Sequence, residues 1–151
     1  MTDQENSTDA EIDTVPGDWE SLEKRGFFAG KESFATIAGP YFYNKGKAPG
    51  VGFLAEEKHL NLAGVVHGGC LATLADMALW DICAREVGPF RAVTVTLNTE
   101  FLGSARAGEF ISAEGDALKA SGSIFFARGL ITARGRPVMS FSGSLKRLRT
   151  P

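Results

Sequence analysis

One carboxylate stands out in the sequence because it lies in the middle of an apolar segment. Between Cys70 and Cys83 there is no Gly or Pro, and Ala and Leu dominate, so this segment predicts a long, largely buried helix. On that helix Asp76 has apolar neighbours one turn away in both directions, and Thr73 is the hydroxyl among them. A carboxylate in apolar surroundings is costly unless it is paired or used. Asp76 is therefore a candidate base or nucleophile; the alternative is a solvated residue on a thin exposed stripe.

The residues just before the helix could bind a polarised carbonyl. The run from Gly64 to Gly69 contains Gly68 and Gly69 at the expected helix start, where glycine lets a ligand approach the backbone. The first N–H groups of a helix lack intrahelical partners, and the positive end of the helix dipole lies there too. The alternative is that the glycines only form a tight turn. His67 is then either a helix cap or a ligand contact, and Asn61 alone would usually be a turn residue.

Other kinds of chemistry find no support in the sequence. No second ligand pair accompanies His67 and Cys70, so no zinc site is predicted, and there is no nucleophile elbow or phosphate-binding loop. No metal or organic cofactor is expected. The net charge of −2 gives no basic excess for nucleic acid. No apolar run reaches the roughly 20 residues of a membrane helix, and the N-terminus has no secretory segment.

The two cysteines bear on the cellular compartment. Cys70 and Cys83 would lie about 20 Å apart along one helix, at 1.5 Å per residue, which is too far for a disulfide. Two free thiols favour a reducing, cytoplasmic location.

The elements that must position these residues form a single α+β domain. An acidic tail, expected to be disordered, covers residues 1–17, and the domain covers residues 18–151. Asp18 would cap a short helix through Arg25. The remaining predicted elements are strands at 33–45 and 51–58, the helix at 70–86, and strands at 91–101, 109–119, 123–133 and 138–148. One helix wrapped by a curved antiparallel sheet leaves a sheet face that a dimer would cover.

Alternation assigns the side chains of the strand that follows the helix. It predicts one apolar face, with Val93, Val95, Leu97 and Phe101, and one polar, solvent-facing side, with Thr94, Thr96, Asn98 and Glu100. In the helix, Asp81 and Arg85 are predicted to form an exposed i,i+4 salt bridge without functional interest.

The pattern Asn61-x5-His67-Gly68-Gly69-x6-Asp76 closely resembles the signature of hotdog-fold thioesterases of the phenylacetic-acid-degradation type. The strand at 93–98, Phe101-Leu102 and Gly108 resemble the family's next strand and turn, so the likeness covers roughly residues 33–148. A proline often found near that turn is replaced here by Gly103-Ser104-Ala105. The resemblance implies a hotdog fold, an acyl-CoA thioesterase without a cofactor, and a homodimer or a homotetramer built as a dimer of dimers.

The resemblance also implies roles for individual residues. Asp76 would act as nucleophile or as general base on water, and the backbone N–H of Gly68 would polarise the thioester carbonyl. Asn61, from the opposite subunit, would orient water or substrate, and His67 would hold the thioester end. Thr94 stands where some members carry a hydroxyl that positions the lytic water.

Several points stay open in the sequence. Gly69 and Thr73 are expected as substrate contacts, but the acyl group cannot be inferred: Met77, Trp80 and Phe101 could line a pocket or belong to the core. A cluster of basic residues could meet the CoA phosphates or be solvated surface charge: Arg128, Arg134, Arg136, Lys146, Arg147 and Arg149. The alternatives to a thioesterase are a hotdog module that binds an acyl thioester without hydrolysing it, and a hotdog dehydratase or hydratase.

Overall fold

The computed structural model describes residues 27–29, 34–44 and 50–149. The predicted acidic tail and the short helix after Asp18 lie outside these residues. Within the described part, no helix is long and apolar enough to cross a membrane.

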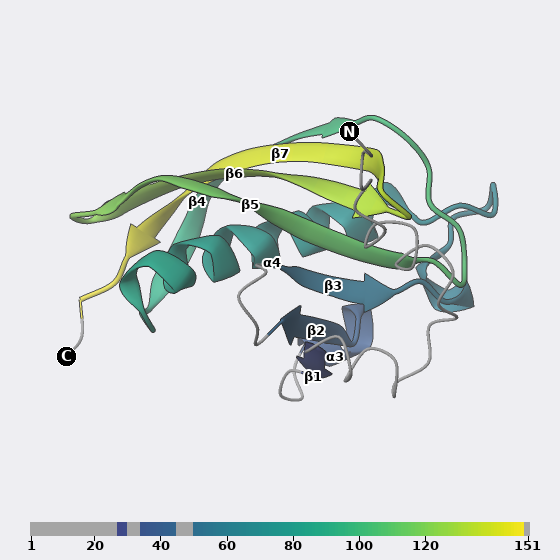
Figure 1. Ribbon diagram of the computed structural model, residues 1–151, viewed down its shortest axis with the longest axis horizontal. Coiled ribbons are helices and arrows are strands. Elements are labelled where there is room, and N and C mark those ends of the chain that lie inside the picture. The colour runs from purple at the N-terminus through teal and green to yellow at the C-terminus, as the bar shows by residue number, and fades with distance from the viewer. Residues whose placement is uncertain (1–26, 30–33, 45–49, 150–151) are drawn as a thin grey trace, which may run out of the picture.

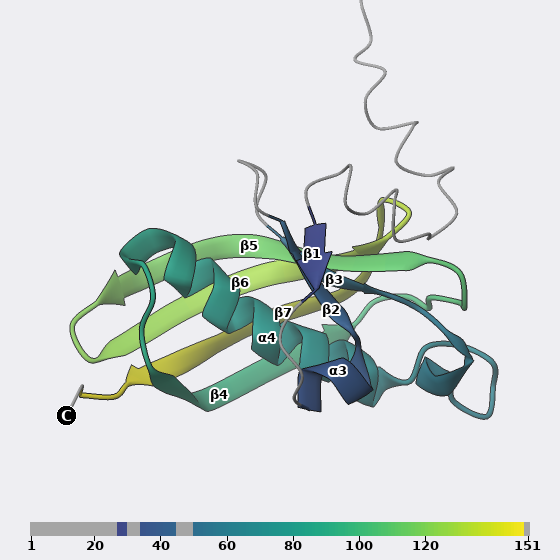
Figure 2. The ribbon, with the colours of Figure 1, turned by 90° about the horizontal axis from the view of Figure 1, so that it is seen from below.

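The described chain is built from one antiparallel sheet and one long helix. The helix is α4 (Gly68–Val87), and it lies across the concave face of the sheet, between β5, β6 and β7 on one side and β2 and β3 on the other (Figures 1 and 2). Among the described residues, the sheet has seven strands in the order β1-β2-β3-β5-β6-β7-β4. The strands are β1 (Phe27–Ala29), β2 (Tyr41–Asn44), β3 (Val51–Leu54), β4 (Ala92–Phe101), β5 (Phe110–Ser121), β6 (Ile124–Ala133) and β7 (Arg136–Arg147). This arrangement confirms the predicted α+β class and the curved sheet wrapped around one helix.

The long helix begins and ends where the sequence indicates. His67 is its N-cap, and Gly88, with φ of +78°, is its C-cap. Its buried residues recur at helical spacing and face the sheet: Leu71, Leu74, Ala75, Ala78, Leu79, Ile82 and Cys83. The prediction of a largely buried helix holds for these residues but not for Trp80, which is 40% exposed. Trp80 therefore marks a part of α4 that the sheet leaves exposed in the single chain.

The last strands match the prediction closely. Met139, Phe141 and Leu145 share the buried face of β7, as the alternation predicts. Cys70 and Cys83 are both free thiols, which confirms that they do not pair. The cytoplasmic location that they favour stays a prediction.

The segment before the long helix differs from the prediction. Residues 33–45 do not form one strand: α3 (Phe34–Ala38) comes first and β2 begins at Tyr41. Pro40 separates the two, because a proline and the residue before it both disfavour a continuing helix. Similarly, the strand predicted at 51–58 ends at Leu54, and a short 3-10 helix, η1 (Glu57–His59), follows.

The side chain of His59 explains why the strand stops early. It is 2% exposed, and its Nδ1 atom accepts the Glu56 N–H at 2.9 Å. The proton is therefore on Nε2, which donates to the carbonyl oxygens of Ala38 at 2.9 Å and Gly39 at 3.0 Å. These bonds require the chain to turn at η1 and tie it to the end of α3.

Strand β4 departs from simple alternation. Its register against β7 shifts between Thr94 and Thr96, which indicates a β-bulge there. Thr94 lies opposite the buried Leu145, whereas Thr96 lies opposite Ser144 and hydrogen-bonds to it at 2.8 Å. The prediction that Thr94 shares a face with Thr96 is therefore wrong, because one extra residue turns Thr94 toward the helix, although both residues are exposed as predicted.

Candidate active site

Asp76 and Thr94 meet on the helix side of the sheet. Asp76 lies half-buried in the middle of α4, and Thr94 lies on the bulged part of β4. The Thr94 hydroxyl donates to Oδ1 of Asp76 at 2.7 Å. No other residue of the described chain hydrogen-bonds to this carboxylate. The arrangement orients Asp76 through one oxygen and leaves Oδ2 free to accept a proton or to attack a carbon.

The hydroxyl that the sequence places beside Asp76 is used elsewhere. Thr73 donates its hydroxyl proton to the carbonyl oxygen of Gly69 at 2.9 Å, one turn earlier in the same helix. The hydroxyl partner of Asp76 therefore comes from β4, eighteen residues away in the chain, rather than from α4.

At the helix start, one backbone N–H is left without a partner. Nδ1 of His67 accepts the Gly69 N–H at 2.8 Å, and the His67 carbonyl accepts the Cys70 N–H at 2.9 Å and the Leu71 N–H at 3.3 Å. Among the described residues, none accepts a hydrogen bond from the Gly68 N–H. Gly68 thus presents a donor at the positive end of the helix dipole.

His67 is a helix cap in this structure, as one of the two interpretations of the sequence had it. Because its Nδ1 atom accepts the Gly69 N–H, the ring proton of the neutral tautomer is on Nε2. The residue is exposed, so this second nitrogen stays available to a ligand.

The Phe101 ring packs directly against the backbone at position 68. A Cβ atom there would lie 2.8 Å from Cε1 of Phe101, at the far end of β4 from Thr94. The Phe101 side chain is 61% exposed. Strand β4 therefore runs alongside α4, with Thr94 next to Asp76 and Phe101 next to Gly68.

Asn61 shapes the loop that leads into the helix. Its Oδ1 atom accepts the Ala63 N–H at 2.9 Å and the Val65 N–H at 3.3 Å, and its own backbone N–H donates to the Val65 carbonyl at 2.8 Å. This is the turn role that Asn61 would take on sequence grounds alone. Only the side-chain NH₂ group is left to reach a substrate.

Within one chain, the predicted site residues fall into two separate groups. Gly68 and Asp76 are eight residues apart on one straight helix, about 12 Å along its axis at 1.5 Å per residue. Asn61 and His67 lie on the Gly68 side, and Thr94 lies on the Asp76 side. The single chain therefore holds two half-sites rather than one assembled site.

The Asp81–Arg85 pair forms as predicted but is less exposed than expected. Nε of Arg85 lies 2.8 Å from Oδ2 of Asp81, whose side chain is only 13% exposed, and the guanidinium also donates to the Asn44 carbonyl at 3.0 Å. Burial raises the pKa of the Asp81 carboxyl, and Arg85 partly offsets this. The pair ties α4 to β2.

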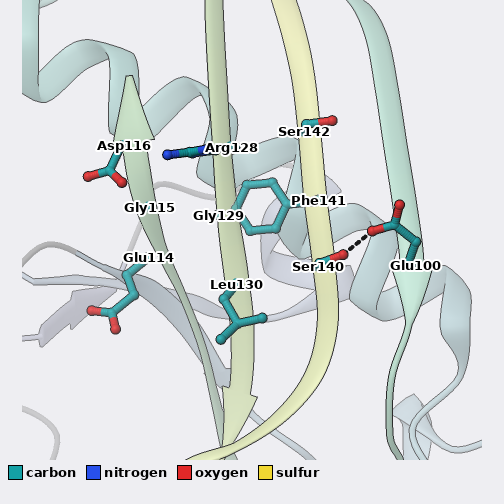
Figure 3. A pocket seen from close by; sticks show the side chains of 10 residues that line it. All are labelled: Glu100, Glu114, Gly115, Asp116, Arg128, Gly129, Leu130, Ser140, Phe141 and Ser142. Carbon is teal, nitrogen blue, oxygen red and sulfur yellow. Dashed lines mark hydrogen bonds between the residues drawn. The ribbon is translucent and has the colours of Figure 1, made fainter. Parts of the chain in front are cut away.

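A hollow of about 420 Å³ lies on the opposite face of the sheet, away from Asp76 (Figure 3). It extends across β5, β6, β7 and β4 and is lined by small and charged residues, among them Glu100, Glu114, Asp116 and Arg128. Ser140 donates a hydrogen bond to Glu100 at its rim. The hollow holds none of the residues singled out for catalysis. Within the described chain, no three His, Cys, Asp or Glu side chains are placed to bind a metal.

The family model and the similar sequences are all those of thioesterases or esterases. The family model of the thioesterase superfamily matches residues 63–140. The chain is 33% identical over 110 residues to "Putative esterase PA0474" of Pseudomonas aeruginosa, covering 71% of this chain and 82% of that protein. It is 34% identical over 93 residues to acyl-coenzyme A thioesterase 13 of Homo sapiens, covering 54% of this chain and 64% of that protein.

Solved structures share the fold. A "Hypothetical Thioesterase Protein with Coenzyme A" from Streptococcus pneumoniae has a TM-score of 0.63 at 20% identity, covering 80% of this chain and 94% of that one. The Escherichia coli PaaI protein from the phenylacetic acid degradation operon has a TM-score of 0.62 at 19% identity, covering 88% of this chain and 86% of that one. These likenesses confirm the predicted hotdog fold.

Proposed function

This chain belongs to the thioesterase superfamily, and we propose that it hydrolyses acyl-CoA thioesters to a free acid and CoA. The observation that carries the proposal is the hydrogen bond from Thr94 to Asp76, which orients a half-buried carboxylate and leaves one of its oxygens free. The choice of acyl-CoA is supported by two of the similar proteins, a human acyl-coenzyme A thioesterase and a streptococcal protein, named as a hypothetical thioesterase, whose structure contains coenzyme A.

We infer that one active site is shared between two subunits. A donor to the carbonyl oxygen and a base acting at the carbonyl carbon must each lie about 3 Å from neighbouring atoms of the thioester. Gly68 and Asp76 of one chain are about 12 Å apart along α4, so they cannot act on the same thioester. A site composed of Asp76 and Thr94 from one chain with Gly68 and Asn61 from its partner resolves this conflict.

The free edge of β4 offers the means of assembly. Within the described sheet, β4 is an edge strand that pairs only with β7, and its Val93 and Val95 are 48% and 56% exposed. Antiparallel pairing of β4 with its copy would continue the sheet and cover this edge. In the register that sets Thr94 opposite the partner's Phe101, Asp76 would lie beside the partner's Gly68, since Thr94 contacts Asp76 and Phe101 contacts Gly68.

The reaction then needs no cofactor. The Gly68 N–H of the partner donates to the thioester carbonyl oxygen, and Oδ2 of Asp76 takes a proton from a water molecule. That water attacks the carbonyl carbon, the C–S bond breaks, and CoA leaves as a thiolate that takes the proton back from Asp76, which restores the carboxylate. In the alternative route, Oδ2 attacks the carbon itself, the C–S bond breaks to release the CoA thiolate, and water then hydrolyses the resulting anhydride to the free acid and the Asp76 carboxylate. Thr94 holds the carboxylate in either case.

The remaining site residues would bind rather than react. The Asn61 NH₂ group would orient the water or the substrate, and the outer nitrogen of His67 would contact the thioester end. Gly69 and Thr73 would contact substrate through backbone and methyl groups, because the Gly69 N–H and the Thr73 hydroxyl are already paired.

A hydrolysis assay over a panel of aromatic and aliphatic acyl-CoA esters tests the proposal. Free CoA is measured with a thiol reagent, for the wild type, for Asp76→Asn, and for Asp116→Asn as a matched change in the outer hollow. We expect Asp76→Asn to lose about 10² or more in kcat and Asp116→Asn to retain it. A wild type that binds the esters without hydrolysing any of them would favour the non-catalytic binding module. Equal turnover by all three proteins would refute the role of Asp76.

A further inference from the structure

His59 is a buried polar side chain that the reaction described above does not use. Only 2% of the residue is exposed, and its ring packs on Phe53 with the ring centroids 4.7 Å apart. Burying an imidazole is costly unless both of its nitrogens are bonded. Here Nδ1 accepts the Glu56 N–H, and Nε2 donates to the carbonyl oxygens of Ala38 and Gly39. The ring therefore joins η1 to the end of α3 through bonds that are shielded from water.

The backbone of the same residue holds the start of the long helix. The His59 carbonyl oxygen accepts the His67 N–H at 2.8 Å, and the Cys70 thiol donates to the same oxygen at 3.7 Å. His67 is the N-cap of α4, and Gly68 is the next residue. A shift of the His59 carbonyl would therefore displace the Gly68 N–H, the donor assigned to the thioester carbonyl.

The loop of residues 59–67 carries the other polar group of this half-site. The backbone bond between the first and last residues of the loop closes it at its base, and an isolated β-bridge between Leu60 and Val66 continues the pairing. Asn61 is the residue that follows Leu60 into the loop, and Gly68 follows the loop at its other end. Fixing the base of the loop therefore fixes both groups at once.

The loop is attached to the rest of the chain in two further directions. In one direction the Val66 N–H donates to the Ala105 carbonyl at 2.8 Å, a backbone bond that any residue but proline could make at position 66. In the other direction the attachment to Ala38 and Gly39 depends on the side chain of His59. A substitution at position 59 removes the second attachment and leaves the first in place.

We propose that His59 is a positioning residue: its bonds to the end of α3 hold the loop of residues 59–67 and, through it, the Gly68 N–H and the Asn61 amide. The proposal rests on the function proposed above. A donor to a developing oxyanion acts at about 2.7–3.1 Å, and a displacement of about 1 Å can cost about 10² in rate. Loss of the tie should therefore lower kcat more than it changes KM.

The kinetic test uses three substitutions at one position. His59→Ala removes both ring nitrogens, His59→Asn keeps an acceptor near the place of Nδ1 but is too short to reach α3, and His59→Gln keeps a donor at about the reach of Nε2. We expect kcat for acyl-CoA to fall at least about tenfold in His59→Ala and His59→Asn with KM nearly unchanged, and His59→Gln to retain most of the activity. Ile82→Ala, a change in a buried residue toward the other end of α4, controls for lost stability and should keep its kcat below its Tm.

Amide hydrogen exchange separates failure of this proposal from failure of the proposed function, because it needs no catalysis. Relative to amides in β6, the His67 N–H should exchange at least about tenfold faster in His59→Ala and His59→Asn than in the wild type or His59→Gln. In Ile82→Ala, both sets of amides should change alike. Faster exchange at His67 supports the tie even if the wild type hydrolyses no acyl-CoA.

Two results would overturn the proposal. One is unchanged relative exchange of the His67 N–H in the substituted proteins, which would show that the imidazole does not hold the loop. The other is faster exchange together with the kcat of an active wild type, which would show that the position of the loop does not affect the reaction. Should His59→Ala not fold, His59→Asn serves in both measurements, since it keeps the acceptor for the Glu56 N–H.

Discussion

Asp76→Ala and Asn61→Asp each remove one group from a different half of the proposed shared site. Asn61→Asp is chosen because aspartate keeps the side-chain oxygen that accepts the Ala63 and Val65 N–H groups, so the turn should persist while the NH₂ donor is lost. Each homodimer then has two defective sites. Loss of a base or of a substrate-positioning donor should reduce kcat by about 10² or more.

Mixing the two variants should restore activity because the defects segregate. If Asp76 of one chain works with Asn61 of the other, a mixed dimer has one site with both defects and one site with neither. Equal amounts that mix at random give about half mixed dimers, so about a quarter of wild-type activity should return. The proteins are unfolded together, refolded, checked for mixed dimers by native mass spectrometry, and assayed with acyl-CoA.

A second mixture provides the control. Asp76 and Thr94 belong to the same half-site, so in dimers of Asp76→Ala with Thr94→Val every site keeps a defect. Their activity should not exceed that of Thr94→Val alone. If mixed dimers of Asp76→Ala and Asn61→Asp form and show no activity, the shared site is wrong, and with it the inference from the 12 Å separation along α4.

Three further outcomes are expected. Thr94→Val should lower kcat about tenfold or more with KM unchanged, because it removes the hydroxyl that orients the Asp76 carboxylate. Thr94→Ser keeps this hydroxyl and should stay largely active; a kcat of Thr94→Val equal to that of the wild type would contradict this. Gly143→Ala should reduce the free energy of unfolding by about 1–3 kcal/mol, seen in calorimetry as a lower Tm, because an added Cβ would clash with the backbone carbonyl oxygen of Thr96 on the neighbouring strand. Burial raises the pKa of the Cys70 and Cys83 thiols, so they stay protonated at neutral pH. Alkylation of the native protein should therefore be slow at pH 7, should accelerate as pH rises, and should be fast at pH 7 in denaturant; rapid native alkylation at pH 7 would refute the burial argument.

Parts of the fold could be read locally because they depend on neighbours in sequence. The helix from Gly68 to Val87 follows from an uninterrupted run of helix-forming residues between a glycine-rich start and Gly88. The buried face of β7 follows from alternation of Met139, Phe141 and Leu145. In both cases the pattern that predicts the element lies within the residues of that element.

Other parts depended on contacts that no local pattern reveals. The side chain of His59 stops β3 at Leu54 because it bonds to carbonyls some twenty residues earlier. The Asp81–Arg85 pair is predicted by its spacing, but its low exposure results from β2 packing over it through Asn44. The spacing of an i,i+4 ion pair on a helix does not reveal whether another element covers the pair, so the sequence alone predicts that it is exposed.

The sequence by itself determined the candidate reactive groups: a carboxylate at position 76 on an apolar helix, and a glycine at 68 where that helix starts. Helix periodicity and the lack of intrahelical partners for the first N–H groups follow from local geometry. Only the tertiary structure decided which hydrogen-bond partners these groups have. The bulge in β4 turns Thr94 onto Asp76, and the His67 cap takes the Gly69 N–H and leaves that of Gly68 free. Both outcomes depend on strand register and side-chain orientation, which are set by packing between segments far apart in the chain.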